Sequence, residues 1–124
     1  MTEKRALVVD DSNLFRLVLR AALERVGFTV EQATGGKEAL EVLQRGAVPD
    51  VVVVDWNMPD LTGVELVQQL RANPILAKLR IIMVTSESSE ERIQHALSQG
   101  VDRYLTKPVQ EEDLFAALRS LGFA

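Results

Sequence analysis

Five ionisable or hydroxyl side chains stand at the ends of segments that predict β-strands in this 124-residue chain. In chain order they are Asp10, Asp11, Asp55, Thr85 and Lys107. Three carboxylates a few ångströms apart would repel, because two charges ~5 Å apart cost roughly 3 kcal/mol at an effective dielectric of about 20. Such a cluster requires a cation, and carboxylate oxygens are ligands that suit Mg²⁺. The pattern therefore favours a magnesium site, and Mg²⁺ bound in this way is usually completed by phosphate oxygens.

The element that must position these groups is a run of four valines at residues 51–54, which ends on Asp55. Four β-branched residues without polar alternation are typical of a strand that is buried on both faces of a parallel sheet. Asp55 should therefore stand at the carboxyl end of that strand, where open α/β sheets place their ligand crevices. If the strand order is 2-1-3-4-5, the crevice lies between the first and third strands, and Asp10 and Asp11 face Asp55 there.

Five consecutive strand–helix units are predicted, with strands at residues 6–9, 28–33, 51–55, 81–84 and 103–106. The second strand carries polar residues, as an edge strand should. This alternation predicts an α/β fold of (βα)5 type, with a doubly wound parallel sheet and helices on both faces. No linker or repeat interrupts the units, so we expect one domain over residues 1–124. Met1 and the short tail favour a complete protein.

The helices are predicted from apolar periodicity and from capping residues. Asp11 or Ser12 is expected to cap the first helix, and Gly27 to end it. Its buried face is predicted to contain Leu14, Leu17, Val18, Ala21, Ala22 and Val26. Capping boxes are predicted at Thr62 with Glu65 for the third helix, and at Ser88 with Glu91 for the fourth. Ile93, Ala96 and Leu97 are expected to form the buried stripe of the fourth helix.

The composition excludes several classes of function. Absence of cysteine rules out a disulfide framework and thiol chemistry. A formal charge of −4 argues against a surface that binds nucleic acid directly. No apolar stretch approaches the roughly 20 residues that cross a bilayer, and no signal peptide is visible, so we expect no membrane insertion and a cytoplasmic location.

Each candidate residue also has an ordinary structural interpretation. The acid pair at residues 10–11 is commonly just a helix cap, Thr85 a strand-end hydroxyl and Lys107 a solvated lysine. Trp56 alone would pass as a packing residue. His95, the only histidine, is expected on an exposed or flanking side of its helix and not as a phosphodonor. The coincidence of these groups at successive strand ends, more than any one of them, favours a functional site.

Four motifs extend this pattern, and they read VVDDS (8–12), DWNMPDLTG (55–63), MVTSE (83–87) and YLTKP (104–108). With them, the chain resembles the receiver domains of response regulators, and in particular the CheY-like single-domain regulators of chemotaxis. The resemblance runs from Leu7 to the last predicted helix. It implies the flavodoxin-like strand order 2-1-3-4-5, which the residues alone do not determine.

The resemblance also implies how the chemistry is divided among the residues. Asp55 would accept the phosphoryl group. Asp10 and Asp11 would bind Mg²⁺ together with Asp55 and the backbone carbonyl of Asn57. Lys107 would contact the phosphoryl oxygens, and the Lys107–Pro108 peptide bond is expected to be cis, since proline makes that isomer accessible.

Further residues match positions that control the signal in this family. Thr85 would contact the phosphoryl oxygens and, with Tyr104, would form the switch. Asn57 and Glu87 lie two residues beyond Asp55 and Thr85, and they resemble the pair that tunes the phosphoryl lifetime in receivers with a brief signal.

The implied function is that of a two-component phosphorelay response regulator. A sensor histidine kinase would donate the phosphoryl group with Mg²⁺ as cofactor. Phosphorylation would change the face made by the fourth helix, fifth strand and fifth helix, which would then bind a downstream target protein, with the flagellar motor switch as one candidate. Such a protein catalyses only its own phosphorylation and dephosphorylation, and is not otherwise an enzyme.

Two alternatives stay open, and two departures from the family pattern bear on them. The chain could be a relay intermediate or phosphate sink. A Mg²⁺-dependent aspartyl-phosphate phosphatase is disfavoured, because Asn57 replaces the second acid of its Asp-x-Asp motif and no cap domain is present.

Ser86 stands where receivers usually have Ala or Gly. The expected output face is acidic at residues 88–91 and 110–113, with few of the lysines expected for motor binding, although acids also favour the first turn of a helix.

Overall fold

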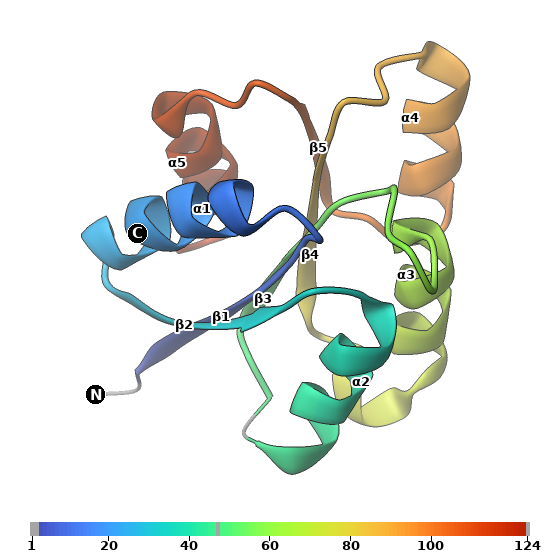
Figure 1. The fold of residues 1–124 in the computed structure, drawn as a ribbon, viewed down its shortest axis with the longest axis horizontal. Coiled ribbons are helices and arrows are strands. Elements are labelled where there is room, and N and C mark those ends of the chain that lie inside the picture. The colour runs from blue at the N-terminus through green and yellow to red at the C-terminus, as the bar shows by residue number, and fades with distance from the viewer. Residues whose placement is uncertain (1–2, 47, 124) are drawn as a thin grey trace.

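The computed structural model describes residues 3–46 and 48–123. At its centre is a parallel sheet of five strands in the order β2-β1-β3-β4-β5 (Figure 1). The strands are β1 (Lys4–Val9), β2 (Phe28–Ala33), β3 (Val51–Val54), β4 (Arg80–Thr85) and β5 (Arg103–Thr106). The predicted α/β fold and its strand order are therefore confirmed, and the predicted strand ends differ from these bounds by at most two residues.

Helices cover both faces of the sheet (Figure 1). They are α1 (Asn13–Arg25), α2 (Gly36–Arg45), α3 (Gly63–Ala72), α4 (Glu90–Ser98) and α5 (Glu111–Ser120), with a short 3-10 helix η1 (Pro74–Leu76) after α3. The side chains of α1 and α5 pack into the core on one face of the sheet. Those of α2, α3 and α4 pack into the core on the other face. The sheet is thus shielded from water on both sides, which is why β3 is an unbroken apolar run.

The register of the central strands brings two acidic residues together. All four valines of β3 are buried. Val9 of β1 pairs with Val54 of β3, so that Asp10 and Asp55 leave the sheet side by side. The backbone N–H of Asp55 donates to the carbonyl of Val9 at 3.1 Å, which extends the pairing to the last residue before the loop.

The predicted buried face of α1 was largely wrong, since of its six residues only Ala22 is fully buried. Leu14, Leu17 and Val18 are exposed, at 72%, 61% and 47% of their surface. The buried residues of α1 are Arg16, Leu19, Ala22 and Leu23. Apolar residues cover an arc of the helix wider than its buried face, so the periodicity did not define a single face, and the packing against β1 and β2 decides which side is buried.

The capping predictions were right for α3 and wrong for α4. Thr62 and Glu65 form both hydrogen bonds of the predicted capping box. In α4 the cap is Ser89 instead of Ser88, and its side chain accepts from the backbone N–H of Arg92. The helix therefore begins one residue later than predicted. Within its expected buried stripe only Ala96 is buried, whereas Leu97 is 38% exposed.

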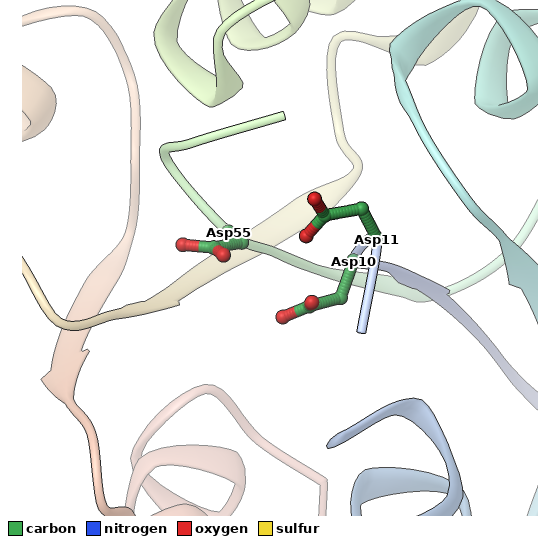
Figure 2. Close-up of side chains that lie close together, drawn as sticks. All are labelled: Asp10, Asp11 and Asp55. Carbon is green, nitrogen blue, oxygen red and sulfur yellow. The ribbon is translucent and has the colours of Figure 1, made fainter. Parts of the chain in front are cut away.

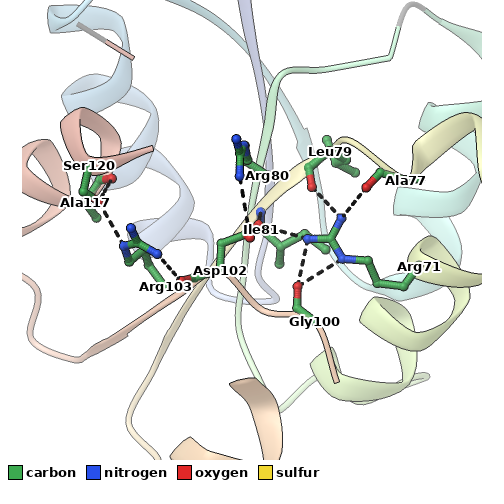
Figure 3. A network of polar contacts seen from close by, with 10 residues as sticks. All are labelled: Arg71, Ala77, Leu79, Arg80, Ile81, Gly100, Asp102, Arg103, Ala117 and Ser120. Atoms are coloured by element: carbon green, nitrogen blue, oxygen red, sulfur yellow. Dashed lines mark hydrogen bonds and ion pairs between the residues drawn. The ribbon is translucent and has the colours of Figure 1, made fainter. Parts of the chain in front are cut away.

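Arg71, near the end of α3, connects that helix to the segments that lead into β4 and β5 (Figure 3). These segments lie at the opposite end of the strands from Asp10 and Asp55. Its guanidinium donates to the carbonyls of Leu79 at 2.6 Å and Gly100 at 2.8 Å, and to the carboxylate of Asp102 at 2.9 Å. Asp102 in turn accepts from the backbone N–H of Ile81 at 2.8 Å. One side chain thus satisfies backbone groups on the segments before β4 and β5.

Replacing Arg71 by methionine should lower the free energy of unfolding by about 2 kcal/mol, because the acceptors lose their donor in a partly buried place. The methionine keeps much of the apolar stem, so the loss reports mainly on the hydrogen bonds. Urea unfolding would measure it, with Lys78→Met at an exposed neighbouring site as the control. Equal stability of the two variants would show that water replaces the guanidinium without loss.

Candidate functional site

Three carboxylates converge where β1 and β3 end (Figure 2). Asp10, Asp11 and Asp55 each offer one oxygen, and these oxygens lie within 4.8 Å of one another. Asp10 and Asp55 are 1% and 7% exposed, whereas Asp11 is exposed. Buried carboxylates this close repel strongly, so the arrangement depends on nearby cations.

Lys107 supplies one positive charge to this cluster from the end of β5. Its Nζ lies 3.0 Å from Oδ2 of Asp10 and 3.3 Å from Oδ2 of Asp55. The backbone holds the residue there, because the N–H of Lys107 donates to the carbonyl of Thr85 at 2.8 Å. The peptide bond between Lys107 and Pro108 is cis, as expected.

One oxygen of Asp55 lacks a partner within residues 3–46 and 48–123. Among the described residues, Oδ1 of Asp55 is buried and makes no hydrogen bond. A buried carboxylate oxygen without a partner is costly, and it calls for an ion or ligand that completes it. The three carboxylates are hard oxygen donors, so this donor set fits Mg²⁺.

The turn between β1 and α1 is held by its own side chains. The backbone N–H of Ser12 donates to Oδ1 of Asp10 at 2.8 Å, and the hydroxyl of Ser12 accepts from the N–H of Phe15 at 3.1 Å. Arg16 is buried and donates to the backbone carbonyl of Asp10 at 2.5 Å. The sequence reasoning missed Arg16, because an arginine in an amphipathic helix is ordinarily assigned to the solvent side.

The loop after β3 is fixed at its far end by Asp60. Its carboxylate accepts from the backbone N–H groups of Gly36 and Lys37, both at 3.0 Å, and so caps α2 from another segment. These hydrogen bonds, that of Lys37 first, lower the pKa of Asp60 below its ordinary value. Sequence reasoning missed this residue too, although Gly35 offers α2 no side-chain cap of its own.

Thr85 and Tyr104 meet at the backbone of Glu87. Thr85 is fully buried, and its hydroxyl accepts from the N–H of Glu87 at 3.4 Å. The hydroxyl of Tyr104 donates to the carbonyl of Glu87 at 2.5 Å. Burial raises the pKa of the Tyr104 phenol, and the nearby Glu87 carboxylate adds to the effect. The two candidate switch residues thus share one segment, which leads into α4.

The loop after β3 also contacts α4. Asn57 donates to the carboxylate of Glu87 at 3.2 Å, and Glu87 lies 3.6 Å from the guanidinium of Arg92. The guanidinium carbon of Arg92 lies over the ring of Trp56, 5.1 Å from the ring centroid. The ring of His95 lies 6.2 Å from that of Trp56 and is exposed on α4, as expected. Ser86, one residue beyond Thr85, is exposed.

Over residues 3–46 and 48–123, no helix is both long and apolar enough to cross a membrane.

The chain matches known proteins over nearly its whole length. The model of the response regulator receiver domain matches residues 6–119. Chemotaxis protein CheY1 of Helicobacter pylori strain J99 is 39% identical over 105 residues, which cover 84% of this chain and 85% of that protein. The CheY homolog of Campylobacter jejuni strain 81-176 is also 39% identical over 105 residues, which cover 84% of this chain and 81% of that protein.

The fold agrees with these matches. The structure of the chemotaxis protein CheY4 of Vibrio cholerae superposes with a TM-score of 0.89 at 34% identity, and the match covers 97% of this chain and 99% of that one. Identity above 30% over most of both chains, together with the matched family model, shows common descent and not merely a common fold. The chain therefore belongs to the response regulator receiver domain family, as a CheY-like member.

Proposed function

We propose that this CheY-like two-component regulator accepts a phosphoryl group on Asp55 from a sensor histidine kinase. The observation that carries the proposal is the buried, unpartnered Oδ1 of Asp55, which lies among two further carboxylates and the ammonium of Lys107. A carboxylate oxygen without a hydrogen bond is free to act as a nucleophile.

The reaction would be an in-line displacement at phosphorus. Oδ1 of Asp55 forms a bond to the phosphorus while the bond to the donor's imidazole nitrogen breaks, and the nitrogen keeps that electron pair. The transition state is loose, so positioning and charge neutralisation contribute most of the rate. Lys107 leaves Oδ2 of Asp55 for a phosphoryl oxygen, and the hydroxyl of Thr85 binds another. Asp10, Asp11, Asp55 and the backbone carbonyl of Asn57 would hold Mg²⁺, which would supply positive charge to the phosphoryl oxygens.

The signal would then pass through Thr85 and Tyr104. If Thr85 moves toward the phosphoryl group, it vacates space that the ring of Tyr104 fills by turning inward. Tyr104 contacts the segment before α4, so its position would alter the face made by α4, β5 and α5. A target protein that binds this face reads the state of Asp55. A Tyr104→Ala protein that is phosphorylated normally and binds its target equally well would contradict this route.

The relatives are chemotaxis proteins, so a motility pathway is the proposed setting, with the flagellar motor switch as one candidate target. The acidic residues of the proposed output face lie in the first turns of α4 and α5, where they favour the helix dipole. A phosphorelay intermediate or phosphate sink is the second candidate. The observation that favours it is this acidic face, which offers few lysines to a motor partner.

The decisive experiment incubates the protein with Mg²⁺ and acetyl phosphate, and measures intact mass and tryptophan fluorescence. Trp56 adjoins Asp55 and is the only tryptophan, so its emission should report the occupied site. We expect a single phosphoryl adduct on Asp55, and none in the Asp55→Asn control. An unmodified wild-type protein, or an equal adduct in the control, would overturn the proposal. Catalytic turnover of phosphate esters would instead support a phosphatase.

Replacing both Asn57 and Glu87 by alanine should lengthen the phosphoryl lifetime by up to about tenfold. Their side chains hydrogen bond to each other two residues beyond Asp55 and Thr85, where we expect them to orient an attacking water, and one such hydrogen bond is worth up to about 1.5 kcal/mol. The decay of radiolabelled protein after removal of the donor would measure it. Gln68→Ala, at an exposed position of α3, is the control. A lifetime unchanged in the double variant would mean that this pair does not control the water.

A further inference from the structure

Lys107 lies against an aromatic ring as well as against carboxylates. Its Nζ is 4.0 Å from the centroid of the Phe15 ring, well inside the distance of about 6 Å at which a cation is attracted to a ring face. Phe15 belongs to the first turn of α1 and is half-buried against the core that α1 shares with α5. The contact joins a residue of α1 to the end of β5.

We propose that Phe15 is a positioning residue, whose ring face holds the ammonium of Lys107 in place for phosphoryl transfer. An ammonium has three N–H donors on a flexible four-carbon stem. Two of its neighbours are Asp10 at 3.0 Å and Asp55 at 3.3 Å. The ring covers another side, so the three contacts together leave the side chain of Lys107 only 22% exposed.

The ring itself is fixed relative to the acidic residues. Before Phe15 in the chain, the hydroxyl of Ser12 accepts a hydrogen bond from the backbone N–H of Phe15, and the backbone N–H of Ser12 donates to the carboxylate of Asp10. After Phe15, Arg16 bonds to the carbonyl of Asp10 at 2.5 Å. Ser12 and Arg16 are thus both tied to Asp10, so the ring of Phe15 and the carboxylate of Asp10 are held in a fixed relation on two sides of Lys107.

This arrangement matters most when Asp55 reacts. In the proposed reaction, on which this inference rests, Lys107 exchanges an oxygen of Asp55 for one on the phosphoryl group. The contact with Phe15 does not need to change in that exchange, so it can keep the ammonium from swinging into solvent. Loss of the ring face should therefore lower the maximal rate of phosphorylation and leave the half-saturating concentration of donor nearly unchanged. The expected loss is about fivefold, which corresponds to about 1 kcal/mol.

The test replaces Phe15 by leucine, by tyrosine and by phenylalanines with one, two and three ring fluorines. Leucine keeps an apolar side chain but has no ring face, and tyrosine keeps the face. Fluorines withdraw electron density from the face with little change of shape. With acetyl phosphate as the donor, we expect about fivefold loss for Phe15→Leu, a rate within twofold of wild type for Phe15→Tyr, and a stepwise decrease along the fluorinated series. Phe115→Leu, at a half-buried ring of α5 that packs against the same core, is the matched control and should keep the wild-type rate.

A second readout needs no phosphoryl transfer. In NMR spectra of the protein without donor, the ε-methylene protons of Lys107 should be shifted upfield by the Phe15 ring, and this shift should disappear in Phe15→Leu and persist in Phe115→Leu. If wild-type Asp55 is never phosphorylated, the proposed function fails while this shift still tests the contact. A flat rate along the fluorinated series, or a Lys107 signal that is the same in Phe15→Leu, would overturn the role of Phe15.

Discussion

Replacing Lys107 by methionine should slow phosphorylation of Asp55 by about 10²–10³-fold. Removal of one preorganised group that stabilises developing charge typically costs this much. Methionine has a similar length and retains apolar contact with Phe15, but it carries no charge to place against the phosphoryl oxygens. Initial rates of adduct formation with acetyl phosphate and Mg²⁺, measured by intact mass, would report the loss.

The matched control is Lys78→Met, which removes an exposed lysine before β4 and should keep the wild-type rate. Lys107→Arg is expected to recover only part of the rate, since a planar guanidinium cannot take the place of a compact ammonium between two carboxylates. Circular dichroism would establish that each variant is folded. A rate for Lys107→Met within threefold of wild type would mean that the ammonium is not used in the transfer.

The location of the site could be predicted from the sequence because it depends on the backbone more than on packing. In a parallel sheet every strand ends at the same edge, so Asp55, directly after β3, and Thr85, the last residue of β4, had to lie at that edge once the strands were identified. The central strands β1, β3 and β4 were the clearest to identify, because burial on both faces leaves runs of apolar residues, whereas β2 and β5 also carry polar residues. The pairing of Val9 with Val54 then carries Asp10 to Asp55.

The orientation of α1 could not be predicted in this way. The apolar arc of the segment is wider than one buried face, and its packing buries Leu19 and Leu23 while it leaves Leu14 and Leu17 in water. When the orientation of α1 is wrong by about one residue position, Phe15 and Arg16 are no longer predicted to contact the site. Phe15 points toward Lys107 and Arg16 toward the Asp10 backbone only because the helix is turned as it is. Such contacts depend on tertiary packing and leave no periodic signal.

Replacing Gly63 by alanine should destabilise the protein by about 3 kcal/mol and displace the loop that follows Asp55. A Cβ built on Gly63 would lie 2.2 Å from the backbone oxygen of Asp55, and a backbone atom cannot turn aside as a flexible side chain can. The N–H of Gly63 also donates to the carbonyl of Trp56 at 2.7 Å, so the start of α3 is packed directly on the loop. The magnitude is at the upper end of overpacking costs for that reason.

Urea unfolding and the rate of phosphorylation, both measured on Gly63→Ala, test this prediction together. Gly46→Ala is the matched control, because a Cβ there would meet its nearest neighbour at 3.7 Å, an ordinary contact. If the clash is relieved by movement of Asp55, the rate should fall with the stability, since the nucleophile no longer faces Lys107. If α3 moves instead, stability falls while the rate is kept, and the position of Asp55 is then held by β1 and β3 alone. A Gly63→Ala protein with wild-type stability and rate would show that the close approach of α3 to Asp55 is not required.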